Sequence, residues 1–161
     1  MTTIVWAPGD LVIANSEGVD IRFAGVEITA DIPHYKGQPA GERGILVRLA
    51  CVTGPVTTKL HSDHGLAMHQ WGEKRKAGGA EAAGPPPVMP GETILKTVRP
   101  VVNDNHDTDY RWVAAQFAGT GTEWDGRWAF VPEPPAGVKH LNIEFTVAGA
   151  LTGKSVRVQL G

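Results

Sequence analysis

The stretch that decides the fold runs from Arg111 to Gly149 and reads RWVAAQFAGTGTEWDGRWAFVPEPPAGVKHLNIEFTVAG. It holds three of the five tryptophans, and near its end apolar residues occupy every second position: Leu141, Ile143, Phe145 and Val147. Successive side chains of a strand point to opposite faces. The alternation therefore predicts a strand that buries one face and exposes the other.

Within this stretch, residues 127–145 (RWAFVPEPPAGVKHLNIEF) combine a tryptophan-bearing strand, a Pro-x-Pro-Pro-x-Gly corner and an alternating strand. This order resembles a C-terminal signature of uncharacterised actinobacterial proteins. The positions that carry the resemblance are Trp128, Pro132, Pro134, Pro135, Gly137, Leu141, Ile143 and Phe145. Where that family continues with a tryptophan or proline, this chain continues with Thr146 to Gly149. The resemblance implies a β-sandwich and no assigned activity.

Further strand patterns lie on both sides of this stretch. Residues 45–52 are apolar at both odd and even positions except for Arg48, which predicts a central strand covered on both faces. Arg48 is expected to point at the rim of the sheet. Asn15 to Gly18 reads as a hairpin turn, and the change of register after Gly25 predicts a β-bulge. Turn signals along the chain separate about nine or ten short segments with strand character. We therefore expect an all-β fold: an antiparallel, jelly-roll-like β-sandwich with one long irregular insertion and at most one short helix.

The insertion is expected at residues 61–91. Gly54-Pro55 reads as a break before a strand at 56–60, and Ser62 or Asp63 as the cap of a short helix that Gly78-Gly79 ends. The following Pro- and Gly-rich run predicts an extended or mobile segment, and strand character resumes at 93–102.

The totals favour one globular domain spanning 1–161. The chain has a formal net charge of -2 and no apolar run long enough for a membrane span, so neither nucleic acid nor membrane is an expected partner. No signal-peptide pattern begins the sequence, which predicts a cytoplasmic location. The single cysteine, Cys51, sits in an apolar run and is interpreted as a small buried hydrophobe.

Two polar clusters could hold metal ions. His61, Asp63 and His64, with His106 as a further ligand, offer the imidazole and carboxylate groups that zinc prefers, although the spacing matches no established motif. The run at 103–109 (NDNHDTD) offers calcium-type oxygen ligands but lacks the glycine and glutamate of an EF-hand loop. For both clusters the simpler interpretation is a polar loop, so no cofactor is expected and a divalent metal remains an alternative.

Aromatic residues near predicted loops suggest a carbohydrate site. Trp71 and Trp124 could stack against a sugar with Asp125 beside them. Trp112 and Trp128 lie inside strand patterns, where a ring is usually part of the core.

The sequence contains no Gly-x-Ser-x-Gly motif and no phosphate-binding glycine loop. It therefore favours a non-enzymatic binding or assembly module that acts through its surface in a larger complex, with a protein partner or self-association into an oligomer. One alternative is a protein that binds a small ligand or a carbohydrate through Trp71, Trp124 and Asp125. Another is a metal-dependent enzyme using His61, Asp63, His64 and His106.

Overall fold

The computed structural model describes residues 3–6, 10–32 and 42–160. In these ranges the chain forms nine strands and two helices: β1 (Thr3–Trp6), β2 (Val12–Ser16), β3 (Val19–Thr29), β4 (Gly44–Cys51), α1 (Pro55–Ala83), α2 (Pro90–Leu95), β5 (Val98–Asn103), β6 (Arg111–Thr120), β7 (Glu123–Val131), β8 (His140–Val147) and β9 (Ala150–Gln159). The fold is thus mostly β, as the alternation predicts.

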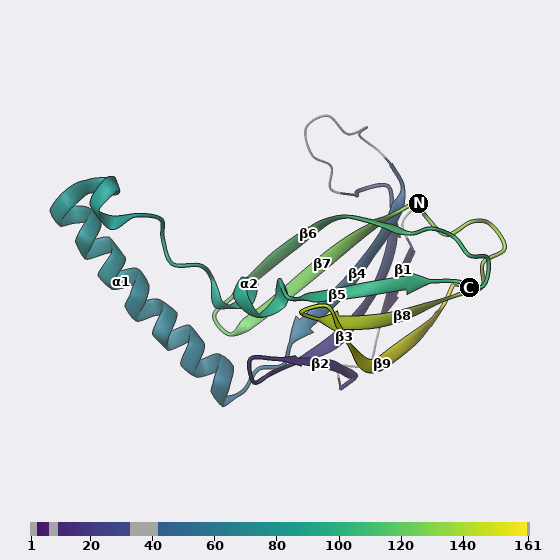
Figure 1. Cartoon of the computed structure of the whole chain (residues 1–161), viewed down its shortest axis with the longest axis horizontal. Coiled ribbons are helices and arrows are strands. Elements are labelled where there is room, and N and C mark those ends of the chain that lie inside the picture. The colour runs from purple at the N-terminus through teal and green to yellow at the C-terminus, as the bar shows by residue number, and fades with distance from the viewer. Residues whose placement is uncertain (1–2, 7–9, 33–41, 161) are drawn as a thin grey trace.

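The strands form two antiparallel sheets (Figure 1). The larger sheet has the order β1-β3-β4-β7-β6, with β2 also paired to β3. The smaller sheet has the order β5-β8-β9. β4 is paired on both sides, with β3 and with β7, so the prediction of a central strand at 45–52 is confirmed.

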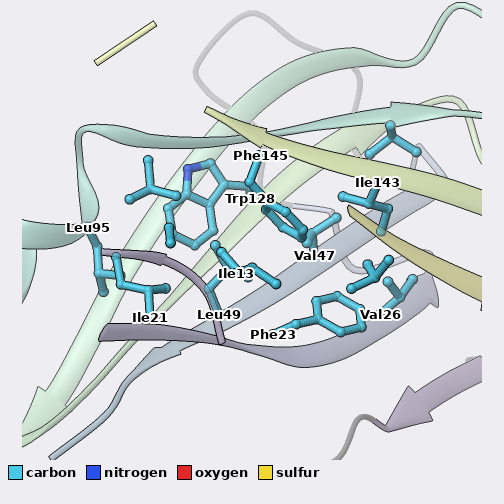
Figure 2. Packing of buried hydrophobic residues seen from close by; sticks show 14 of the residues in the cluster. Ile13, Ile21, Phe23, Val26, Val47, Leu49, Leu95, Trp128, Ile143 and Phe145 are labelled. Carbon is cyan, nitrogen blue, oxygen red and sulfur yellow. The ribbon is translucent and has the colours of Figure 1, made fainter. Parts of the chain in front are cut away.

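One apolar core lies between the two sheets (Figure 2). From the smaller sheet Leu141, Ile143 and Phe145 are buried while Asn142 and Glu144 are exposed, as the alternation predicts. The larger sheet contributes residues from three adjacent strands, among them Phe23, Val47 and Trp128. The rings of Phe23 and Phe145 meet across the two sheets with centroids 6.3 Å apart. Both sheets therefore contribute to one continuous core.

Local backbone signals in β2 and β3 also match the sequence. The turn at Glu17 and Gly18 has φ values of 52° and 83°, a left-handed conformation that suits a tight hairpin. The β3–β4 register shifts between Phe23 and Gly25, which confirms the predicted bulge.

A helix is present where the sequence predicts one, between Ser62 and Gly79, but the predicted bounds are wrong. α1 begins at Pro55, so 56–60 is helical instead of a strand, and Ser62 and Asp63 lie inside the helix instead of capping it. Its conformation is interrupted at Gly79, where φ is 82°, and residues 80–83 are helical again. The expected glycine stop is therefore a kink inside a 29-residue element.

The start of α1 has a clear local cause. Proline is well tolerated at the first helical position because it has no N–H to satisfy there. Thr57 completes the cap: its hydroxyl accepts a hydrogen bond from Gly54 N at 2.8 Å and contacts Gly54 O at 3.0 Å. Gly54-Pro55 therefore begins a helix soon after β4 ends at Cys51.

A second helix, α2, replaces the first part of the strand expected at 93–102. Its Ile94 and Leu95 are buried in the core, and β5 begins only at Val98. Ser16 fixes this helix to β2 by donating a hydrogen bond from Oγ to Ile94 O at 3.0 Å. With α1 and α2 together, the expectation of at most one short helix is also wrong.

α1 projects from one end of the two sheets (Figure 1). Thr57, in its first turn, is its only buried residue. In the described part of the chain, no helix has both the length and the apolar character needed to span a bilayer.

Candidate functional site

The residues predicted to bind a metal ion lie in two separate places. His61, Asp63 and His64 are on α1, where Asp63 pairs with Lys59 at 2.7 Å and His64 Nε2 is buried without a hydrogen-bond partner. His106 is in the β5–β6 connection, at the end of the sheets away from α1 (Figure 1). Across the described ranges, no group of three or more His, Cys, Asp or Glu side chains is close enough to hold a metal ion.

The polar run at 103–109 forms a turn organised by Asp104. Its Oδ1 accepts hydrogen bonds from the backbone N–H groups of His106 (2.8 Å) and Thr108 (3.2 Å), and Oδ2 accepts one from the Tyr110 hydroxyl at 2.6 Å. Burial acts to raise the pKa of Asp104, but these hydrogen bonds outweigh it and lower the pKa to about 2. Burial and the adjacent carboxylate raise the pKa of Tyr110. The Asp104 carboxylate thus holds the turn together through its own hydrogen bonds.

This turn predicts a specific loss of stability in acid. Because the pKa of Asp104 falls from 3.8 to about 2 on folding, its stabilising effect is complete above pH 3.8 and is lost as the pH falls toward 2. Asp104→Asn should therefore be less stable than the wild type at pH 7, and the difference should shrink toward pH 2. Urea unfolding at pH 7, 4 and 3 measures this. Asp107→Asn, a control at an exposed position of the same turn, should show no such convergence.

Trp71 closes the far end of the α1 projection. Its indole N–H donates a hydrogen bond to Gly84 O at 3.0 Å, and the guanidinium of Arg75 lies 5.3 Å from the centre of its ring. The half-buried ring thus ties the chain after the Gly79 kink back onto the helix. The contacts of Trp71 are therefore with α1 and the residue that follows it.

Trp124 and Asp125 face opposite sides of β7. Trp124 is 2% exposed, belongs to the core and donates its indole N–H to Gly121 O at 2.8 Å. Asp125 is exposed on the outer face of the larger sheet. Trp71 thus lies apart from the other two residues. Trp124 and Asp125 border one cavity, but the buried Trp124 ring offers no open face for a sugar.

The remaining strand tryptophans differ from each other. Trp128 is in the core, as predicted, and its ring meets that of Phe117 edge-on with centroids 5.7 Å apart. The prediction is wrong for Trp112, which is 44% exposed on the edge strand β6. The Arg99 guanidinium lies 4.3 Å from the centre of the Trp112 ring, a cation–π contact.

Three arginines gather on the outer face of the larger sheet, beside Asp125. Arg48 on β4 lies directly opposite Arg127 on β7, and Arg22 on β3 is in register with Ala50, which is in turn opposite Asp125. One cavity of about 210 Å³ is lined by all three arginines and by Asp125. We call this the arginine groove. The prediction of Arg48 at the rim of the sheet is wrong: Arg48 is half-buried in the middle of the sheet.

The arginine groove continues into a larger open cavity of about 580 Å³. Arg22, Ala50 and Asp125 line both cavities, and Thr53, Thr120 and Glu123 add hydroxyl and carboxylate groups to the larger one. No sequence motif marks this surface, because its residues come from four strands and the chain after β4, and meet only through the pairing of the strands.

Cys51 also borders the larger cavity, but its thiol is buried, which confirms the interpretation from sequence. Burial, and then the nearby Asp125 carboxylate, raise its pKa to about 12. A thiol with this pKa is protonated near neutral pH, and the protonated form is a poor nucleophile.

Comparisons of the chain with protein-family models, curated proteins and solved structures found no match.

Proposed function

We propose that this protein is a non-enzymatic assembly module, a β-sandwich that joins further copies of its own chain through the α1 projection. The observation that carries this proposal is the exposure of α1. A 29-residue helix with a single buried residue gains little from packing against its own domain.

The composition of α1 supports a need for an external partner. Isolated helices are marginal in water and most helical stability in proteins comes from tertiary packing. α1 also contains four glycines, at 65, 72, 78 and 79, and a glycine in a helix interior costs about 1 kcal/mol relative to alanine. Its exposed apolar side chains include Leu66 (59% exposed) and Met68. A surface that covers them would supply the missing packing.

The distribution of charge favours a second copy of the chain as that partner. The far part of α1 carries the exposed basic run Lys74-Arg75-Lys76. The β5–β6 connection, at the opposite end of the molecule, carries exposed Asp107 and Asp109 (Figure 1). Opposite charges at opposite ends favour head-to-tail contact, which produces rings or filaments.

Native mass spectrometry and sedimentation velocity, from micromolar to millimolar protein, test this proposal. The wild type should gain mass with concentration and lose it with added salt, because salt screens exposed charges. Leu66→Glu, and separately Lys74→Glu with Lys76→Glu, should remain monomeric. Lys139→Glu with Lys154→Glu, a matched change at exposed positions outside α1, should associate like the wild type.

A charge swap makes the test specific to the two proposed surfaces. A mixture of the Lys74→Glu/Lys76→Glu variant with an Asp107→Lys/Asp109→Lys variant should form mixed assemblies, although neither variant associates alone. A wild type that stays monomeric up to millimolar concentration would contradict the proposal.

A further inference from the structure

We propose that the arginine groove binds a small hydroxylated oxyanion, whose phosphate or carboxylate group is held by Arg48, Arg127 and Arg22. This inference does not rest on the proposed assembly function, because the groove and α1 are separate surfaces.

The register of the sheet gives the first reason. Side chains directly opposite each other in an antiparallel pair have Cβ atoms about 4.5–5.5 Å apart, and like charges at such positions are destabilising. Arg48 and Arg127 are opposite each other in this way. Within the described ranges, the side chains of these two arginines and of Arg22 form no ion pair and no hydrogen bond. A bound anion would relieve this repulsion.

The shape of the surface gives the second reason. Between the arginines stand two small residues, Ala24 and Ala50, which leave room for a ligand. The planar guanidinium group binds carboxylate and phosphate oxygens through pairs of parallel hydrogen bonds. A cavity of about 210 Å³ that three such groups line accommodates one oxyanion and the atoms next to it.

The carboxylates of the groove define the rest of the ligand. Asp125 lies in the same cavity as the arginines, and Glu123 lines the adjoining one with Thr53 and Thr120. An ionised carboxylate only accepts hydrogen bonds, so the ligand must bring donors to it. A molecule with one oxyanion and several hydroxyl groups, such as a sugar phosphate or a sugar acid, meets both requirements.

Isothermal titration calorimetry with four probes tests this inference: glucose 6-phosphate, glucuronate, inorganic phosphate and glucose. Either glucose 6-phosphate or glucuronate should bind, more tightly than inorganic phosphate, and uncharged glucose should not bind measurably. The stronger of the two charged sugars identifies the oxyanion. Arg48→Gln with Arg127→Gln should weaken binding at least tenfold, whereas Arg157→Gln, at an exposed position of the smaller sheet, should leave it unchanged.

Two further measurements separate binding from folding. The Arg48→Gln/Arg127→Gln variant should keep the wild-type thermal midpoint or exceed it, because the substitution removes opposed charges. Ala50→Glu leaves all three arginines in place but adds a carboxylate between them, and it should also weaken binding at least tenfold. Binding of neither charged sugar, or binding that both groove variants retain, would overturn the inference.

Discussion

Replacement of Phe145 by alanine should lower the free energy of unfolding by about 3–5 kcal/mol, the range for a fully buried phenylalanine. Phe145 is 0% exposed, and its ring meets that of Phe23 on the other sheet. The substitution therefore opens a cavity between the two sheets, which neither sheet can fill without moving relative to the other. Urea unfolding followed by tryptophan fluorescence and by circular dichroism measures the loss.

A control on the same strand isolates the role of the core. Glu144 points to the exposed face of β8, so Glu144→Ala should change stability by no more than about 0.5 kcal/mol. Because the sheets share one core, the two probes should also report a single transition for the Phe145→Ala variant. A loss below about 1 kcal/mol would argue against a core shared by both sheets.

Gly91→Ala should lower the free energy of unfolding by about 1–3 kcal/mol, the usual cost of overpacking a core. A Cβ at Gly91 would lie 2.6 Å from both Cβ and Cγ of Trp124, closer than such atoms can approach. Trp124 is buried at these atoms and cannot swing away as the end of a flexible side chain could. Thermal and urea unfolding measure the effect.

Gly72→Ala is the matched control for this substitution. Gly72 lies within α1, where an added Cβ would meet no atom within 4 Å. Alanine is favoured over glycine in a helix interior by about 1 kcal/mol, so this variant should be as stable as the wild type or more stable. Equal stability of Gly91→Ala and wild type would show that α2 and β7 are not in close contact.

Strands such as β8 could be predicted from the sequence because they bury one face in the chain's own core. The spacing of Leu141, Ile143 and Phe145 records that burial directly. α1 offered no equivalent signal, since a helix that buries almost nothing has no apolar face with helical spacing. End signals predicted only the middle of this helix, and Gly54-Pro55, interpreted as a strand break, is also the chemistry of a helix start.

The surface residues were harder to predict than the core. Trp112 has the apolar neighbours of a core residue, but β6 is an edge strand, and strand order is not visible in local periodicity. The arginine groove could not be predicted from the sequence for the same reason. Arg22, Arg48 and Arg127 are far apart in sequence, and only the pairing of β3, β4 and β7 brings them together. An arginine in an otherwise apolar run, such as Arg48, was the single available clue.

Both ends of the α1 projection meet the domain beside Trp124. The chain leaves β4 through Val52 and Thr53, which line a cavity with Trp124, and it returns at Gly91, which packs against the same side chain. The projection is therefore an insertion whose two ends are attached to the domain at one place. Because α1 pairs with no strand, evolution could lengthen, shorten or replace it without disturbing the sheets. The length of the projection can therefore differ between related proteins whose two sheets are the same.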